Sequence, residues 1–356
     1  MSAIKAQPKT NRGNFFEDFK VGQTIVHSTP RTVTDGDVAL YNALYGSRFA
    51  VQSADSFAQS IGYPQAPVDD MLVFHMVFGK SVPDISLNAV ANLGYAEGRF
   101  IAPVFVGDSL SATSTVIGLK QNSNGKTGVV FVRTTGTNQR EETVLEYVRW
   151  VMVKKGDLDA PAPETVQPEL ADSVAPELLG TCVPPLKLSE WNNAASGSPF
   201  RWGDYEVGEK IDHIDGMTVE EAEHQLATRL YQNTAKVHFN RHSEKDSRFG
   251  RRLIYGGHVI SLARALSFNG MANAFHIAAI NGGRHIAPLF AGDTVYAWSE
   301  VLDKQPINGR DDIGALRMRL VATKDKPCSD YPLRDENGAY QHGVILDFDY
   351  WVTVAR

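Results

Sequence analysis

Two segments in the second half of the chain hold residues suited to moving a proton and stabilising negative charge. His238 lies five positions after Asn233, and Gly256, Gly257 and His258 open an apolar stretch. Because histidine titrates near neutral pH, His238 is a candidate general base or acid. Asn233 is a candidate for orienting a water molecule, although an amide cannot accept a proton from it. The amide of Gly257 is a candidate donor to an oxyanion at a helix start, and Gly256 is a candidate substrate contact.

Each of these residues also has a structural alternative. His238 suits a loop beside a strand, Asn233 suits a turn, and Gly257 suits the geometry of a helix start. His258 is a candidate ligand contact, with packing or capping as its alternative. The choice between function and structure therefore depends on the elements that position these residues.

Several arginines are candidate partners for an anionic group. Arg48, Arg99 and Arg284 could bind a carboxylate or a phosphate, because a guanidinium pairs with either through two parallel hydrogen bonds. A solvated surface charge is the alternative for all three. Five basic residues between His238 and the glycine pair could attract phosphates, although such a run is usually a solvated face: Arg241, Lys245, Arg248, Arg251 and Arg252.

The chain contains a long internal repeat. GRFIAPVFVGD at 98–108 returns 185 positions later as GRHIAPLFAGD at 283–293. DFKVG at 18–22 and DYEVG at 204–208 form a second pair, and YVRWV at 147–151 resembles FDYWV at 348–352. A repeat of this length is a duplicated domain and not a solenoid unit.

The repeat divides the chain into three parts. We predict an N-terminal domain over 14–155, a connector over 156–199 and a C-terminal domain over 200–356. The connector holds seven prolines, which oppose long helices and sheet ladders. We therefore expect it to be extended and to lie along the surface.

Each copy has the same order of predicted elements. A weak helical pattern covers 34–45, and a nearly all-apolar segment at 71–78 predicts a buried helix capped by Asp69 or Asp70. The second copy has this central helix at 259–268, after the glycine pair. Runs rich in β-branched and aromatic residues then predict three strands per copy: 109–119, 128–135, 144–153, 294–301, 314–323 and 344–354. Asparagine–glycine turns at 122–125 and 308–309 separate successive strands.

A buried helix followed by an antiparallel meander predicts an α+β fold in which a sheet wraps around a central helix. This is the hot-dog arrangement, and two copies predict a double hot dog. Two independent α+β domains are the alternative.

Composition excludes several classes of protein. The net charge is −6 and the pI is near 5.9, so general attraction to nucleic acid or to an anionic membrane is not expected. Cys182 and Cys328 form no metal-type or disulfide pattern, and no Gly-rich nucleotide motif is present. The polar N-terminus is unlike a secretory signal, and no apolar run is long enough to span a bilayer. We expect a cytoplasmic protein without a metal site.

The motifs resemble those of the MaoC-like hydratase family. Its signature Asp-x-Asn-Pro-x-His is similar to NTAKVH at 233–238, and its glycine motif at the start of the central helix is similar to GGH at 256–258. Its Pro-x-x-x-Gly-Asp segment matches 288–293, and the resemblance covers essentially the whole chain.

Departures from the family pattern separate the two copies. Asn233 replaces the family aspartate, and the Asn-Pro pair is absent. In the first copy Gln52 replaces the histidine, and Asp69-Asp70 replaces the glycine pair. The resemblance therefore implies that the second copy is catalytic and that the first copy shapes the pocket.

The resemblance implies a hydro-lyase that reversibly hydrates a short-chain enoyl-CoA. Mesaconyl-CoA and β-methylmalyl-CoA are the implied pair, as in carbon assimilation by the ethylmalonyl-CoA pathway. Catalytic roles would fall on His238, Asn233 and Gly257, and the implied binding residues are Arg284, Arg99, Arg48, Gly256 and His258. CoA would be part of the substrate, so no cofactor is expected. We also expect a homo-oligomer.

Two other functions stay open on the sequence. One is an acyl-CoA thioesterase, which needs a carboxylate beside the thioester carbon to activate water. Asn233 cannot supply that carboxylate, but Asp70 of the first copy keeps this function open. The other is a non-catalytic acyl-CoA-binding protein.

Overall fold

The computed structural model describes residues 9–356, and its centre is one ten-stranded antiparallel sheet. The strands lie in the order β1-β3-β4-β5-β2-β7-β10-β9-β8-β6. The first copy supplies β1 (Thr24–Thr32), β2 (Ala89–Phe100), β3 (Ser109–Gln121), β4 (Thr127–Thr137) and β5 (Thr143–Lys154). The second copy supplies β6 (Lys210–Thr218), β7 (Ala274–His285), β8 (Thr294–Pro306), β9 (Ile313–Lys324) and β10 (Val344–Ala355). The halves join where β2 pairs with β7, so the duplicated copies extend one sheet side by side.

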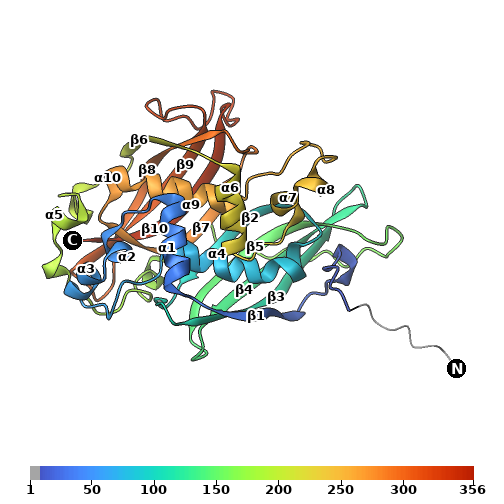
Figure 1. Cartoon of the computed structure of the whole chain (residues 1–356), viewed down its shortest axis with the longest axis horizontal. Helices are drawn as coiled ribbons and strands as arrows, with labels where there is room; N and C mark the ends of the chain where they lie inside the picture. The colour runs from blue at the N-terminus through green and yellow to red at the C-terminus, as the bar shows by residue number, and fades with distance from the viewer. Residues whose placement is uncertain (1–8) are drawn as a thin grey trace.

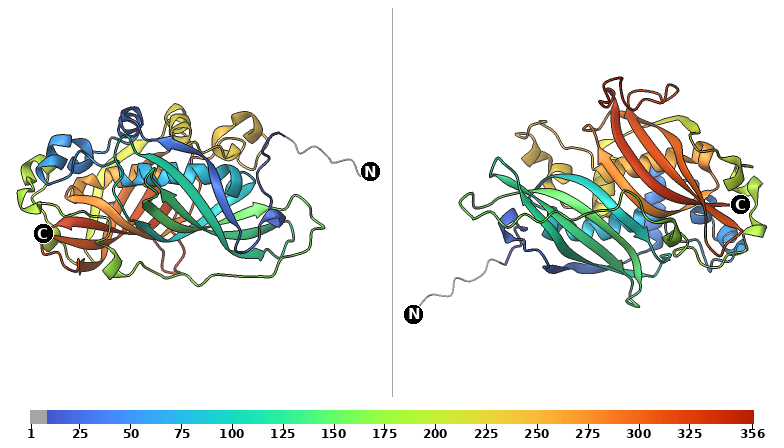
Figure 2. Two further views of the ribbon diagram at one scale, coloured as in Figure 1. Left: turned by 90° about the horizontal axis from the view of Figure 1, so that it is seen from below. Right: turned by 180° about the vertical axis from the view of Figure 1, so that it is seen from behind.

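Each half of the sheet wraps around one central helix, α4 (Asp70–Ser81) in the first copy and α9 (Gly256–Leu266) in the second. Both lie on the same face of the sheet, with α1 (Asp35–Tyr45) and α6 (Glu221–Leu230) beside them (Figures 1 and 2). Every residue of α4 after Asp70 is buried, as its all-apolar pattern predicts. The predicted α+β double hot dog is therefore confirmed.

Side-chain caps fix where the first-copy helices begin. The Thr34 side chain accepts a hydrogen bond from the Asp37 amide at the start of α1. Of the two carboxylates predicted to cap α4, Asp69 is the cap, since its oxygen accepts from the Met71 amide at 2.9 Å. Asp70 is the first residue of the helix and is free to bind elsewhere.

The three strands predicted in each copy are confirmed as β3, β4 and β5 and as β8, β9 and β10, and each copy has two further strands that were not predicted. The outer strands β1 and β6 are mostly exposed on both faces, so they lack the alternation of a half-buried strand. The inner strand β7 is buried on both faces for most of its length, which also removes alternation. The central helix of the second copy begins at Gly256 and ends at Leu266, earlier at both ends than predicted.

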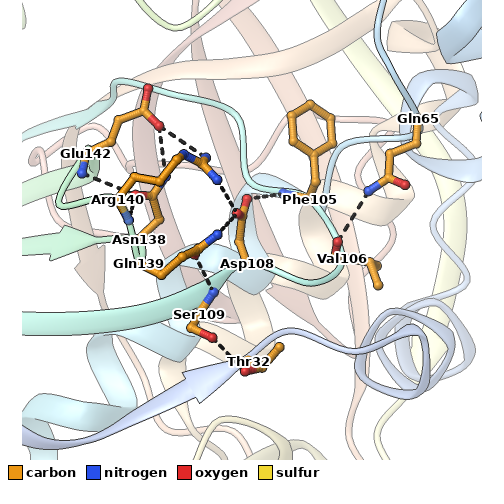
Figure 3. A network of polar contacts seen from close by, with 10 residues as sticks. All are labelled: Thr32, Gln65, Phe105, Val106, Asp108, Ser109, Asn138, Gln139, Arg140 and Glu142. Atoms are coloured by element: carbon orange, nitrogen blue, oxygen red, sulfur yellow. Dashed lines mark hydrogen bonds and ion pairs between the residues drawn. The ribbon is translucent and has the colours of Figure 1, made fainter.

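The repeated Pro-x-x-x-Gly-Asp motif is a turn held by its aspartate (Figure 3). Asp108 accepts hydrogen bonds from the Phe105 amide, from Gln139 and from Arg140. Its twin Asp293 accepts from the Phe290 amide at 2.9 Å in the same way. The motif therefore sets the entry into β3 and β8 in both copies, which explains why it repeats.

The proline-rich connector is only partly a surface segment, which corrects the prediction. Its first part crosses the outer face of the sheet, where Val166 pairs with Leu119 (Figure 2). Its second part packs between the two copies, where Trp191 contacts Phe57 of the first copy and Phe275 of the second. Six of its hydrophobic side chains are buried: Val174, Leu179, Cys182, Val183, Leu188 and Trp191. It contains only short helical turns and the four-residue helix α5 (Asn193–Ser196).

We predict that Gly79→Ala destabilises the protein by about 3 kcal/mol or more. A Cβ at this position in α4 would overlap the backbone carbonyl of Tyr231, which cannot rotate away. Gly36→Ala in α1 is the matched control, because its Cβ would meet only the Thr34 hydroxyl at 3.6 Å. Denaturant unfolding of both variants measures the difference, and equal stability would contradict the packing described here.

Candidate active site

His238 lies in the short helix α7 (Lys236–Phe239), and one of its ring nitrogens is already bound. Its Nδ1 lies 2.8 Å from the Leu253 carbonyl oxygen, and Leu253 is itself tied to Val237 by a backbone hydrogen bond. Because a carbonyl only accepts, Nδ1 carries the proton and Nε2 is left as an acceptor. Burial lowers the pKa of His238 to about 4, so the ring is neutral near pH 7 and can act as a base.

Asn233 shapes the turn that leads to His238. It is buried, and its side-chain oxygen accepts a hydrogen bond from the Ala235 amide at 3.2 Å. Its own amide donates to the Thr228 carbonyl at the end of α6. The side chain therefore has the hydrogen bonding of an asparagine turn, and it adds no charge beside His238.

The glycine pair begins α9 and lies among the rings of three neighbouring side chains. A Cβ on Gly256 would overlap the ring of His285, which ends β7. A Cβ on Gly257 would overlap His75 of α4 and the ring of Tyr255. The amides of both glycines belong to the first turn of the helix, where no carbonyl of the same helix can accept from them. They form the positive end of the helix beside the histidines, with Gly257 buried there.

His258 is the third residue of α9, and its side chain is buried in the core. Its Nδ1 lies 2.7 Å from the Tyr45 hydroxyl, and the Tyr231 hydroxyl donates to that of Tyr45 at the same distance. Burial lowers the pKa of His258 to about 3. The structure thus places this residue in a buried network between α9 and α1, which is its packing alternative.

None of the three arginines singled out in the sequence lies beside His238 with a free guanidinium. Arg99 is held by Glu146 on the next strand. Arg48 stacks 4.6 Å from the ring of Phe268, beyond the far end of α9. Arg284 is exposed at the end of β7, next to His285. These charges could not be placed from sequence, since their partners lie on other strands and helices.

His285 was missed in the sequence as a candidate site residue. Its Nε2 is buried without a hydrogen-bond partner, and its ring packs on Gly256. Burial and the neighbouring His238 lower the pKa of His285 to about 4. Comparison of the two copies contains the signal, because the repeated motif has Phe100 at this position in the first copy and histidine in the second.

His224 of α6 is a second histidine that the sequence analysis missed. Its Nε2 accepts a hydrogen bond from the Tyr255 amide at 2.9 Å, directly before the glycine pair. Burial, and then His258 and His238, lower the pKa of His224 to about 2. Its ring centre lies 6.2 Å from that of His238. This residue therefore holds the start of α9 in place, close to the candidate base.

The equivalent region of the first copy has different chemistry. Gln52 donates to the Phe275 carbonyl. Asp70 pairs with His276 at 2.8 Å and also accepts from the Ile277 amide. Burial lowers the pKa of His276 but the Asp70 carboxylate raises it, and the carboxylate prevails. Asp70 is thus bound to an imidazolium and lies at the start of α4, not beside His238.

The fold, the glycine pair and the histidine loop define the class as a double hot-dog protein of the MaoC-like dehydratase type. A family model described as mesaconyl-CoA hydratase matches residues 2–333, so the chain belongs to that family. It is 66% identical to a β-methylmalyl-CoA dehydratase of Chloroflexus aurantiacus, with 98% of this chain and 99% of the relative covered.

Solved structures agree with this assignment. A putative MaoC domain protein dehydratase from Chloroflexus aurantiacus is 65% identical, with a TM-score of 0.95 and coverage of 98% of this chain and 99% of that one. A conserved hypothetical protein from Mycobacterium tuberculosis, with a double hotdog fold, has a TM-score of 0.70 at 23% identity and coverage of 97% and 99%. The second likeness concerns the fold alone. Among residues 9–356, no helix has the length and apolar character needed to cross a bilayer.

We predict that stability falls steeply as the pH drops from 6.5 toward 4. Burial is the largest cause that lowers the pKa of each of five neighbouring histidines, to between about 2 and about 4: His75, His224, His238, His258 and His285. Below pH 6.5 these histidines are protonated in the unfolded chain but not in the folded chain. Each of them therefore lowers the free energy of unfolding by about 1.4 kcal/mol per pH unit.

One carboxyl opposes this trend. Burial, and then Asp70, raise the pKa of Asp69 to about 6, so below that pH the folded chain binds one proton more than the unfolded chain. The histidines outnumber it, so we expect the thermal midpoint to fall by about 10 °C between pH 6.5 and 5. Calorimetry at several pH values measures this, and a flat profile would show that the histidines are not buried in their neutral form.

Proposed function

We propose that the protein reversibly hydrates mesaconyl-CoA to β-methylmalyl-CoA at the site around His238. The observation that carries this proposal is the neutral ring of His238, whose Nδ1 is held by the Leu253 carbonyl and whose ring centre lies 5.5 Å from that of Tyr255, the residue that precedes α9. Membership of the mesaconyl-CoA hydratase family supports the choice of acyl chain.

Hydration needs a base for water, an acid for the α-carbon and donors for the thioester oxygen. His238 Nε2 would take a proton from water as the water oxygen adds to the β-carbon. The amides of Gly256 and Gly257 would donate to the thioester oxygen, where the negative charge of the enolate develops. Asn233 would act by holding the turn that carries His238, without altering its charge.

His285 is our candidate for the acid that the Asn233 position cannot supply. Its ring lies on Gly256, so a thioester held at the glycine amides would place its α-carbon near this ring. The proton of His285 would pass to the α-carbon while His238 gains one from water. Transfer from His238 to His285 would then reset the pair, and neutral imidazole can serve as such a donor in a desolvated site.

The basic segment after His238 would bind the phosphates of CoA. Arg241, Lys245, Arg248 and Arg251 are all exposed in a chain whose net charge is −6. Arg252 is less accessible and pairs with Glu221 at 2.9 Å, and Arg241 lies 3.8 Å from the same carboxylate. We propose that no separate cofactor takes part, since the thioester is itself the activated group. A cytoplasmic location and a homo-oligomer stay predictions of the sequence.

The thioesterase alternative lacks a carboxylate at the site. Asp70, which kept it open in the sequence, is engaged by His276 and the Ile277 amide. A binding-only protein would have no need of a neutral histidine held in one tautomer close to the residue that precedes α9. Hydration is therefore the function that we propose.

We predict that His238→Asn lowers kcat for mesaconyl-CoA hydration by 100-fold to 10,000-fold, the usual order for losing a general base. Loss of the enoyl-thioester absorbance measures the reaction, and a free-thiol assay runs beside it. His242→Asn is the matched control, because His242 is exposed in the adjacent helix α8 (Arg241–Glu244). Thiol release by the unmodified protein, or full activity of His238→Asn, would overturn the proposal.

For His285 we predict that replacement by phenylalanine, the residue of the first copy, keeps the fold but lowers kcat at least about 100-fold. Added imidazole should partly restore kcat in His285→Ala, because this small molecule can enter the space left by the ring. Unchanged kcat in His285→Phe would assign both proton transfers to His238.

A further inference from the structure

Arg149 is a fully buried cation without an anionic partner. It lies on β5 with 0% of its surface exposed, and none of the ion pairs among the described residues includes it. Its Nη2 donates to the Ser81 hydroxyl at 2.8 Å, and a weak contact of 3.5 Å joins Nη1 to Ser86. Its Nε has no hydrogen-bond partner. Two neutral hydroxyls do not replace the water that this charge gave up on folding.

The fold does not require a cation at this position. In the alignment of the two copies, Tyr350 of β10 is the equivalent of Arg149. A tryptophan follows in each copy, Trp150 in the first and Trp351 in the second. Tyr350 is also fully buried, so the same place in the second copy is filled by a neutral side chain. Ser81 ends α4, where a positive charge is weakly favoured, but that benefit is small against the cost of burying a guanidinium.

The surroundings of Arg149 reach the candidate active site. Tyr95 lies directly opposite Arg149 on β2, and its ring centre is 6.1 Å from that of His285. The guanidinium stacks 4.2 Å from Phe78, whose ring centre is 5.7 Å from that of Tyr255. The Tyr255 ring in turn lies 5.5 Å from His238. Two chains of aromatic contacts thus join the cation to the two histidines.

A second polar group of the same cluster also lacks a partner. Tyr147 lies two residues before Arg149 on the same face of β5, and its hydroxyl is buried without a hydrogen bond. A guanidinium and a phenol together offer the donors that a carboxylate accepts. A short acyl chain whose thioester is held at the glycine amides would then direct a carboxylate at its far end toward this buried pair.

We infer that Arg149, with Tyr147, forms the subsite that binds a free carboxylate on the acyl chain and selects dicarboxylic over neutral acyl thioesters. This inference rests on the proposed function for the location of the thioester. It replaces Arg48, Arg99 and Arg284 in that role. The substrate would provide the negative charge that Arg149 lacks, and a neutral chain of equal length would leave the cation unpaired.

The test compares two enoyl-CoA substrates, mesaconyl-CoA with a carboxylate and crotonyl-CoA without one. We expect Arg149→Met to lower the ratio of kcat/KM for mesaconyl-CoA over crotonyl-CoA by about 30-fold or more, the scale for breaking a buried charge pair. Arg133→Met is the matched control, because Arg133 lies on the adjacent strand β4 and pairs with Glu97. It should leave the ratio as in the unmodified protein.

If Arg149 has only a structural role, Arg149→Met lowers kcat/KM for both substrates by the same factor. An unchanged ratio in this variant would therefore overturn the inference. Arg149→Lys keeps the charge and guards against misfolding, and it should retain part of the preference. If the unmodified protein hydrates crotonyl-CoA as efficiently as mesaconyl-CoA, the carboxylate subsite is refuted and the hydratase function stays intact.

Binding of saturated thioesters tests the subsite without turnover. Calorimetric titration should show that succinyl-CoA binds more tightly than butyryl-CoA, and that Arg149→Met removes this difference. Equal affinities in the unmodified protein would overturn the inference whatever the catalytic assays show. Absence of hydration with a preserved succinyl-CoA preference would instead refute the proposed function alone.

Discussion

The start of α9 can exist only because Gly256 and Gly257 lack side chains. His285 fills the space where one Cβ would lie, and His75 and Tyr255 fill the other. His75 belongs to the first copy, whereas His285 belongs to the second. The two copies therefore meet at the first turn of one helix, with rings packed on both sides of that turn. The geometry of the site depends on this contact, since any larger residue would push the copies apart.

Duplication gave this chain two equivalent regions, and they have diverged in complementary directions. The second copy has His238, Gly257 and His285, where the first has Gln52, Asp70 and Phe100. The first copy in turn has Arg149, where the second has Tyr350. The connector packs Trp191 between the copies, against Phe57 of the first and Phe275 of the second, whose carbonyl accepts from Gln52. One copy thus retains groups for proton transfer, and the other retains a buried charge and a closed core.

Repeats and turn chemistry predicted the fold well, because they are local. The repeated Pro-x-x-x-Gly-Asp motif and the apolar run of α4 are read directly from neighbouring residues. The motif forms the same turn in both copies, and α4 is buried as predicted. Strands β1, β6 and β7 were missed because exposure on both faces, or burial on both, removes alternation. The pairing of Arg99 was missed for a similar reason, since Glu146 is 47 positions away in the chain and no local pattern shows that contact. Arg149 has no signal beyond its mismatch with Tyr350.

The charge balance of the proposed site connects these substitutions. A carboxylate at 233 would favour the imidazolium form of His238 and raise its pKa, whereas Asn233 leaves burial to hold that pKa at about 4. A substrate that carries its own carboxylate would bring the same negative charge into the site and would raise the pKa of the base. A cation that pairs with that carboxylate cancels the effect, so His238 would stay neutral with substrate bound. The loss of an aspartate in one copy and the burial of an arginine in the other are, on this view, parts of one electrostatic arrangement.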